Sequence, residues 1–428
     1  MEKLVTDEKE IELDSADSFI TKLYKKIYLH ALSKMRNGHV RVIENGNESY
    51  HLGDPNSNFK NYNNGLMQIN RPSQFYKKAV LFGDIGFSES YVDGDWDTDD
   101  ITNILSWFLI NVEDSPSLSG AKKFKPHIRL FNLINRFYHL RRPNTIKGSR
   151  KNIVEHYDLG NQFYKLFLDQ TMTYSSAYFH KDDISLEEAQ LEKYSALASH
   201  LNLQPHHHVL EIGSGWGGFS LYLAKKFGCK ITTVTISDEQ FKYAKELFQK
   251  EGVDHLVDIQ LMDYRLIRGK FDRIVSIEML EAVGEKYLDT YFKKCNELLT
   301  PEGVLALQVI TCPDSRYEEF KNGVDFIQKH IFPGSLLPSI GRINQAINRT
   351  GNMHLLNLLD MGKSYAKTLQ LWLKTFDQNL SAIRSLGYDE RFVRLWRYYL
   401  SYCEAAFKMR NISVVQLTYT KPNNLSLD

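Results

Sequence analysis

Residues 208–218 read HVLEIGSGWGG, and this stretch decides the fold. The run from His208 to Gly213 is short and mostly apolar, and it ends in an acid and a glycine, as a buried strand does before a tight turn. A helical pattern follows from Trp216 to Phe227. The stretch therefore predicts a strand, a glycine turn and a helix whose N-terminus a ligand can approach closely.

Strand and helix patterns alternate along the chain beyond this unit. Further strands are predicted at 230–236, 257–262, 271–278, 303–311, 354–359 and 412–419, and helices at 238–250, 287–299, 363–386 and 390–409. Such alternation indicates βαβ units and a parallel sheet covered on both faces. We therefore expect an α/β, Rossmann-like sheet with helices on both faces, preceded by a small α+β domain.

The glycine spacing fits two classes of ligand. Gly213, Gly215 and Gly218 match the G-x-G-x-x-G pattern of dinucleotide sites, which also needs an acid about 20 residues further on. The second strand ends instead in Thr235. Glu211, before the loop, gives the E/D-x-G-x-G form of S-adenosylmethionine (SAM) methyltransferases, so a class I SAM methyltransferase sheet is favoured over a dinucleotide fold.

The charge total hides a basic segment. The chain has 53 Lys plus Arg against 52 Asp plus Glu, yet residues 115–154 contain ten basic residues and no acid. Apolar residues recur there at helical spacing, as in Ile128, Phe131, Ile134 and Phe137. This pattern suits an amphipathic helix on an anionic membrane surface, and equally a solvated linker helix packed on its neighbour. We divide the chain into a small N-terminal domain (1–114), a basic linker (115–151) and a SAM-binding domain (152–428).

The remaining composition favours a reduced, cytoplasmic protein. The four cysteines form no C-x-x-C pair, and no metal site is predicted. The N-terminus, MEKLVTDEKEIELD, has no apolar run of the signal-peptide kind. The longest strongly apolar stretch, 104–112, is far shorter than the about 20 residues of a membrane-spanning helix.

Several ordered segments carry a family resemblance. They read GFSESYVDGDWDTDD (86–100), HYDLGNQFYKLFLDQTMTYSSAYF (156–179), VLEIGSGWGGFS (209–220), TVTISDEQ (233–240), FDRIVSIEMLEAVG (271–284), HIFPGSLLPS (330–339) and YYLSYCEAAFKMRNISVVQLTY (398–419). From about Phe75 to Pro422 the chain resembles the cyclopropane-fatty-acid synthases, including the mycolic acid cyclopropane synthases. The resemblance implies methylene transfer from SAM to a cis double bond of a phospholipid acyl chain. It also implies a lipid-handling role for the N-terminal domain, a catalytic role for residues 152–428, a homodimer, and a bound bicarbonate as the base.

The resemblance also implies roles for single residues. The bicarbonate site falls on Glu281, Tyr365 and the backbone of Ile310, while Ser176 and Gln308 replace a cysteine and a histidine of the family. Cys403 matches an older proposal for a nucleophile, with a buried, inert thiol as the alternative. The SAM contacts fall on Tyr174, Ser175, Glu211, Gly213, Ser214, Gly215, Trp216, Gly217, Thr235, Gln240, Asp263 and Tyr264. For Glu278, a SAM contact and a structural role both stay open.

These patterns leave several functional hypotheses. The first is cyclopropane formation on phospholipids at an anionic bilayer, by a protein bound to the inner face of the membrane. Ser176 and Gln308 motivate a second, a methyl-branched or methylenated lipid product. A third is a SAM-binding membrane docking protein without catalysis. Nucleic acid is not an expected partner, because IEMLEAVG stands where DNA amino-methyltransferases carry N/D-P-P-Y/F/W.

Overall fold

The structure, a computed structural model, describes residues 19–46, 48–59, 61, 65–112 and 159–427. The predicted basic segment, 115–151, lies outside these residues. The chain divides into two compact units. The first contains Met1–Phe137, Gly323–Phe326 and Tyr388–Met409, and the second contains Tyr138–Asn322, Ile327–Gly387 and Arg410–Asp428.

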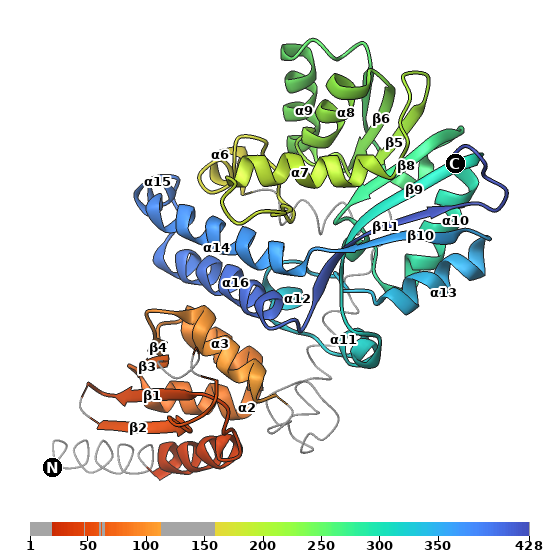
Figure 1. Cartoon of the computed structure of the whole chain (residues 1–428). Helices are drawn as coiled ribbons and strands as arrows, with labels where there is room; N and C mark the ends of the chain where they lie inside the picture. The colour runs from red at the N-terminus through yellow and green to blue at the C-terminus, as the bar shows by residue number, and fades with distance from the viewer. Residues whose placement is uncertain (1–18, 47, 60, 62–64, 113–158, 428) are drawn as a thin grey trace, which may run out of the picture. The chain divides into compact units, whose positions relative to one another are not determined.

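The second unit is built on a seven-stranded sheet (Figure 1). Its strands lie in the order β10-β11-β9-β8-β5-β6-β7. Their bounds are β5 His208–Ile212, β6 Lys230–Thr235, β7 Val257–Leu261, β8 Phe271–Ile277, β9 Leu299–Thr311, β10 His354–Asp360 and β11 Ser413–Thr420. Strands β5 to β9 pair in parallel, while β11 runs antiparallel to both β9 and β10. The α/β, Rossmann-like prediction is confirmed, including the two late strands.

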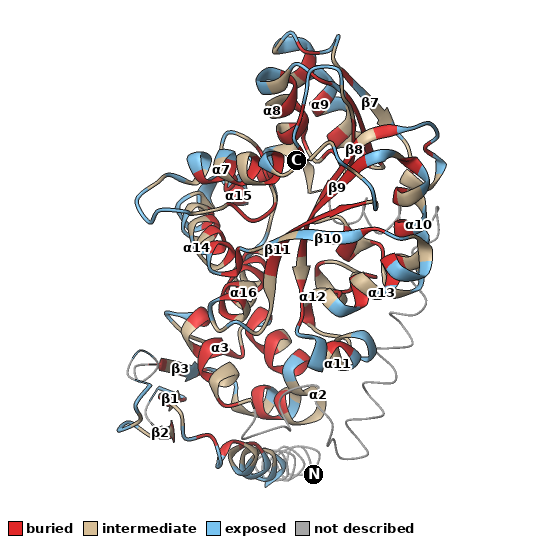
Figure 2. Ribbon diagram, turned by 45° about the vertical axis from the view of Figure 1, so that its right-hand side comes forward, coloured by how far each residue is buried: buried red, intermediate tan, exposed pale blue. Residues whose placement is uncertain are grey.

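Helices cover both faces of this sheet because its strands are apolar on both sides. Leu210 and Ile274 pack with α10 (Leu288–Leu298) and α13 (Ile340–Thr350). Their chain neighbours Val209 and Val275 point to the opposite face, toward α7 (Leu186–Ser199), α8 (Gly218–Phe227) and α9 (Asp238–Lys250). The central strands are accordingly buried along much of their length (Figure 2).

Side-chain caps fix where several of these helices begin. A capping box, in which Ser185 and Glu188 bond each other's backbone N–H groups, starts α7. Ser237 accepts a hydrogen bond from the backbone N–H of Gln240 and starts α9 at the end of β6. The other α-helices described in this unit are α6 Gly160–Tyr164, α11 Tyr317–Asn322, α14 Gly362–Gln378 and α15 Leu380–Ser385, while α12, Phe326–His330, begins at the last residue of a first-unit segment.

The first unit has the α+β character that the sequence predicts. Its four-stranded sheet has the order β2-β1-β3-β4, with β1 His39–Glu44, β2 Glu48–Gly53, β3 Gly65–Ile69 and β4 Trp96–Asp97. The unit also contains a helical stretch at 19–32 and the helices α2 (Pro72–Val92), α3 (Ile101–Ile110) and α16 (Glu390–Lys408). None of the helices in the described part of the chain is long and apolar enough to cross a bilayer.

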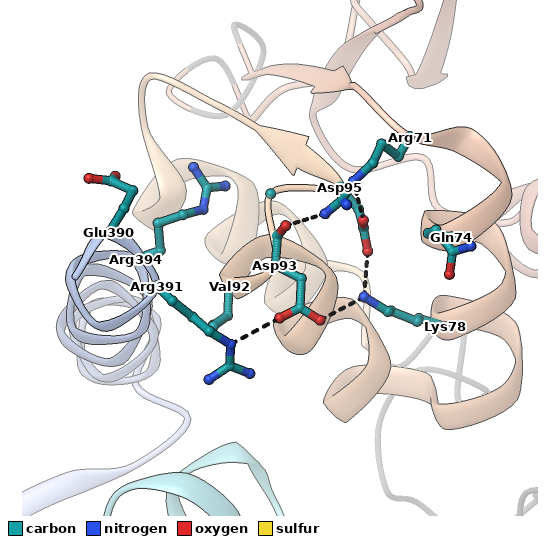
Figure 3. A pocket seen from close by; sticks show the side chains of 10 residues that line it. Arg71, Gln74, Lys78, Val92, Asp93, Asp95, Glu390, Arg391 and Arg394 are labelled. Atoms are coloured by element: carbon teal, nitrogen blue, oxygen red, sulfur yellow. Dashed lines mark hydrogen bonds and ion pairs between the residues drawn. The ribbon is translucent and has the colours of Figure 1, made fainter.

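Helix α16 belongs to the first unit, although the sequence-based division assigned it to the catalytic domain. The Arg394 guanidinium donates to the carbonyls of Tyr91 and Trp96 and to the Asp97 carboxylate. Arg391 pairs with Asp93, as Figure 3 shows. These contacts join residues about 300 positions apart, so a linear division of the sequence could not include them.

Candidate active site

The predicted site residues of the second unit come from strand ends and from two flanking segments. The loops after β5, β6, β7 and β8 all lie at the carboxyl edge of the parallel strands, where open α/β sheets bind ligands. Strand β9 adds Gln308 and Ile310, and helix α14 adds Tyr365. The segment 171–178 supplies Tyr174, Ser175 and Ser176. The fold thus gathers groups that are up to about 190 residues apart in the sequence.

The glycine loop after β5 has the predicted open backbone. Gly213, Gly215 and Gly217 have φ angles of 95°, 49° and 92°, which glycine adopts without steric cost. At Gly217 a Cβ would lie 2.9 Å from Phe248 Cζ, so the loop packs tightly on α9. At Gly215 a Cβ would meet no atom within 4 Å, so this residue borders open space. The loop therefore combines a rigid support with an accessible backbone.

Glu211, the acid before this loop, is engaged by the protein itself. Its Oε2 accepts hydrogen bonds from Ser220 Oγ at 2.5 Å and from Thr233 Oγ1 at 2.6 Å. Burial raises the pKa of Glu211 to about 7. The side chain thus ties β5 to α8 and β6, and its role as a SAM contact stays a prediction.

The acceptors after β6 and β7 are also partly engaged. Thr235 Oγ1 donates to Gln240 Oε1 at 3.0 Å, and both side chains are buried. Both oxygens of Asp263 accept from the Arg265 guanidinium, at 2.8 and 2.6 Å. Tyr264 follows in a 3-10 turn, with its ring 5.3 Å from that of Tyr291. The Gln240 amide nitrogen and the remaining lone pairs of Asp263 are the groups that a nucleoside could use.

Aromatic rings and a buried lysine hold the segment that contains Tyr174. The Tyr174 ring centroid lies 5.2 Å from that of Tyr164 and 5.4 Å from that of Trp372. Trp216 packs on Tyr164 at 4.9 Å, and its indole N–H donates to Asn161 Oδ1. These contacts connect the segment, the glycine loop and helix α14 into one wall.

Lys193 is a polar group of this region that sequence reasoning missed. It is fully buried, and its Nζ donates to Ser175 Oγ at 2.8 Å. Burial lowers the pKa of Lys193 to about 8. The negative charge of Glu278 acts in the opposite direction, because it favours the charged ammonium. The sequence pattern that could have identified Lys193 is its helical spacing from Ala189 and Leu197, which places a lysine on the buried face of α7.

Two carboxylates lie at the centre of the site, the half-buried Glu278 and the buried Glu281, and Glu278 has more hydrogen bonds. Its Oε1 accepts from the Ser176 backbone N–H and from Gln308 Nε2, both at 2.8 Å, and its Oε2 accepts from the Tyr365 hydroxyl at 2.8 Å. Gln416 Nε2 donates to Gln308 Oε1 at 3.0 Å, which turns the Gln308 amide nitrogen toward Glu278. We call these three donors, on Ser176, Gln308 and Tyr365, the donor triad.

The backbone of Glu278 is strained. Its φ is 49°, in the left-handed region that costs a residue with a Cβ roughly 1–2 kcal/mol. Its N–H donates to the Gln308 carbonyl at 2.7 Å, which holds the turn directly after β8. In this left-handed conformation the Glu278 carboxylate reaches the donor triad.

Glu281, the predicted site carboxylate, has one hydrogen-bond donor. Its Oε1 accepts from the Ile310 N–H at 2.5 Å, so two positions that the resemblance places around one bound ion contact each other directly. Within the described residues, its buried Oε2 has no hydrogen-bond partner. Burial, and then the charge of Glu278, raise the pKa of Glu281 to about 8, so Glu281 is mainly protonated at neutral pH.

The structure thus brings together Glu281, Ile310, Gln308, Ser176 and Tyr365, but it distributes their contacts differently from the prediction. Tyr365, Gln308 and the Ser176 backbone bond Glu278, whose role the sequence left open. The Ser176 hydroxyl donates to the Ala177 carbonyl instead. A hydrogen-bond direction of this kind depends on side-chain placement, which a sequence pattern does not contain.

Cys403 lies on α16, in the first unit, whereas the other candidates lie in the second. Burial, followed by the influence of Asp325, raises the pKa of the Cys403 thiol well above its usual value. A protonated thiol is a weak nucleophile, so this environment favours the inert alternative.

Comparison with known proteins gives consistent similarities. The sequence model of the mycolic acid cyclopropane synthetase family matches residues 145–417. The chain is 35% identical to the tuberculostearic acid methyltransferase of Mycobacterium tuberculosis, over 82% of each chain. It is 37% identical to the cyclopropane-fatty-acyl-phospholipid synthase of Escherichia coli, over 81% of this chain and 86% of that one.

Solved structures agree with this result. A mycolic acid cyclopropane synthase, CmaA1, complexed with SAH and CTAB, is 32% identical and superposes with a TM-score of 0.60. The similarity covers 64% of this chain and 98% of that one. The matched stretch of sequence contains all the second-unit candidates named above.

Proposed function

The chain belongs to the mycolic acid cyclopropane synthetase family of SAM-dependent methyltransferases, and from this premise we propose that it builds cyclopropane rings on unsaturated phospholipid acyl chains. The donor acts as a methylene source: the methyl carbon of SAM is added across a cis double bond and loses one proton. The observation that carries the proposal is the pair of carboxylates, the half-buried Glu278 and the buried Glu281, next to the glycine loop at the carboxyl edge of the sheet.

The residues present fit SAM, which supplies an electrophilic methyl group when bound. The glycine loop would accept the methionine and ribose part against its backbone, and the Gln240 amide would donate to the ribose. Asp263 retains acceptor capacity for the adenine amine while Arg265 holds its orientation. These roles need no charge beyond what the loop and the helix N-terminus supply.

An alkene is a weak nucleophile, so the site must align it and exclude water. As the C–S bond breaks, its electrons stay on sulfur, and the alkene π electrons form the new C–C bond. One former alkene carbon becomes a cation. Aromatic faces attract such a cation, and Tyr174, Trp372 and Tyr365 form a connected group of rings next to the carboxylates. Loss of a proton from the added methyl group then closes the ring.

The bicarbonate that the resemblance implies does not fit the donors of this chain. Tyr365, Gln308 and the Ser176 N–H already donate to Glu278. A second anion would have to displace the Glu278 carboxylate from these donors or lie against it, and like charges repel strongly at that distance. We therefore assign no step to bicarbonate.

The lipid is proposed to be reached at an anionic bilayer surface on the inner face of the membrane, by means of the basic segment 115–151. That segment lies outside the described residues, so its charge pattern is the only support. A homodimer is proposed from the family resemblance alone. Sedimentation of the purified chain at several concentrations measures it directly.

The test of the activity uses purified chain, SAM and liposomes of anionic phospholipids with cis-unsaturated chains. We expect each modified double bond to gain one CH₂ by mass spectrometry, and NMR of the product to give the signals of a cyclopropane ring. SAH binding with no gain of CH₂ on any lipid offered would reject catalysis and leave the docking-protein hypothesis.

A methyl-branched or methylenated product is the second candidate. Ser176 and Gln308 favour it, since they lack the thiol and imidazole of the family pattern, and one relative is called a tuberculostearic acid methyltransferase. Ring closure and methylenation add the same mass, so NMR of the isolated lipid decides between them.

A further inference from the structure

We infer that Glu278 is the general base of this reaction, so that a carboxylate of the chain itself, held by the donor triad, removes the proton that closes the ring. The inference rests on the proposed function and names the group that performs its last step. It assigns a catalytic role to a residue for which the sequence left a SAM contact and a structural role open.

The first argument is the convergence of donors. Three hydrogen bonds reach the Glu278 carboxylate from three separate parts of the chain: the 171–178 segment, strand β9 and helix α14. Each of the three bonds is 2.8 Å long. Gln416 and Gln308 extend the network behind the carboxylate, so its position is fixed before any ligand arrives.

The second argument is the backbone at Glu278. A left-handed residue next to a ligand site is usually glycine, because glycine alone adopts this φ without strain. The chain carries a glutamate there instead. The chain thus has a glutamate at a position where its backbone conformation is strained, as expected of a side chain with a function in the site.

The third argument is the difference between the two carboxylates. Glu281 has one donor, the Ile310 N–H, whereas Glu278 has the donor triad and the positive charge of Lys193 in its surroundings. Hydrogen bonds and a nearby cation favour the ionised form, so Glu278 is the member of the pair that can accept a proton. Burial opposes this effect and raises the pKa of Glu278, which makes it a stronger base than an exposed glutamate.

The step balances without any further reactant. A C–H bond of the added methyl group breaks, and its electrons form the third bond of the ring. The proton goes to the Glu278 carboxylate, which becomes a neutral carboxylic acid. After the product leaves, the carboxylic acid releases this proton to water, and the donor triad again holds the Glu278 carboxylate.

The test compares wild type, Glu278→Gln and Glu278→Gly in buffer freed of carbon dioxide and in buffer with added bicarbonate. We expect wild-type turnover to be the same in both. Glu278→Gln keeps the size of the side chain but cannot take the proton, so turnover should fall by about 10²–10⁴-fold in either buffer. Glu278→Gly relieves the backbone strain and leaves the donor triad without a carboxylate. Added bicarbonate should therefore raise the turnover of this variant at least about tenfold.

Two measurements besides activity support the reading. SAH binding by calorimetry should be unchanged in both variants, which excludes unfolding as the cause. Bicarbonate should raise the melting temperature of Glu278→Gly, because a ligand that binds only the folded chain stabilises it, and leave wild type and Glu278→Gln unchanged.

The experiment distinguishes failure of the proposed function from failure of the proposed role of Glu278. If wild type forms no CH₂ adduct in either buffer, the proposed function fails and the role of Glu278 fails with it. If wild type is active but requires bicarbonate, or if Glu278→Gln turns over like wild type, the proposed function stands and Glu278 is not the base.

Discussion

Glu278 and Glu281 carry the same side chain, three residues apart, and their surroundings give them different hydrogen-bond donors. Glu278 accepts from the donor triad, whereas Glu281 accepts from one backbone N–H. The raised pKa of Glu281 keeps this side chain mainly protonated at neutral pH, which removes like-charge repulsion between it and the neighbouring Glu278. The chemistry of the pair is thus decided at the scale of single hydrogen bonds.

Removal of one member of the donor triad tests this scale. In Tyr365→Phe the Oε2 atom of Glu278 loses its 2.8 Å hydrogen bond while the ring stays. A hydrogen bond to a charged group contributes about 1.5–3 kcal/mol, so we expect turnover to fall roughly tenfold to hundredfold. SAH affinity, measured by calorimetry, should stay within about twofold. Unchanged turnover would contradict a contribution of Tyr365 to the reacting state.

The raised pKa of Glu281 predicts a dependence of stability on pH. Between the ordinary value of 4.5 and about 8, the folded chain keeps a proton that the unfolded chain releases. The free energy of unfolding should therefore fall as pH rises through this window, and Glu281→Gln should remove that part of the fall. We expect a difference of about 1–4 kcal/mol between wild type and variant when urea unfolding near pH 5 and near pH 8.5 is compared.

Glu211 also titrates in that window with the same sign. It is present in both proteins, so the comparison with Glu281→Gln isolates Glu281. Parallel pH profiles for the two proteins would contradict the assignment.

At the scale of elements, the glycine loop depends on its contact with α9. In Gly217→Ala the added Cβ would lie 2.9 Å from Phe248 and 3.0 Å from Ala244, at a φ of 92°. We expect a loss of about 2–4 kcal/mol in the free energy of unfolding and weaker SAH binding. The matched control is Gly228→Ala at the end of α8, where φ is 64° and a Cβ would meet no atom within 4 Å.

The control carries only the backbone cost of about 1 kcal/mol and should leave SAH binding intact. Urea unfolding and calorimetry measure both variants. Equal losses at the two glycines would mean that the packing on α9 adds nothing.

The elements of the second unit could largely be predicted from sequence. The strand at 271–278 ends one residue earlier in the structure, and the helix at 363–386 divides at Asn379 into α14 and α15. Hydrophobic periodicity identifies a helix or strand but not which carboxylate a distant amide will bond. Glu281 was named from the family resemblance, whereas the sequence left the role of Glu278 open and gave no reason to name Lys193.

At the scale of the whole molecule, the basic segment is the feature to test against membranes. Arg141→Gln with Arg142→Gln removes two of its ten positive charges. A basic residue near an anionic surface contributes about 1 kcal/mol, so the loss of two should cost about 2 kcal/mol and weaken binding to anionic vesicles about thirtyfold, as measured by sedimentation. High salt should weaken wild-type binding in the same way.

The matched control replaces two exposed lysines of α9, Lys242 and Lys250, by glutamine. It changes the net charge equally, and its binding should stay near wild type. An equal loss in the control would mean that overall charge, and not the basic segment, attracts the surface.

The path of the chain through its two units determines the order in which they can be finished during synthesis. The chain enters the first unit again at Tyr388, completes α16, and returns at Arg410 to form β11 between β9 and β10. A ribosome releases the N-terminal residues first, yet the first unit waits for a helix near the end of the chain. A nascent chain cut at Gly387 would lack α16 from one unit and an inner strand from the other, so neither unit should survive limited proteolysis until translation passes β11.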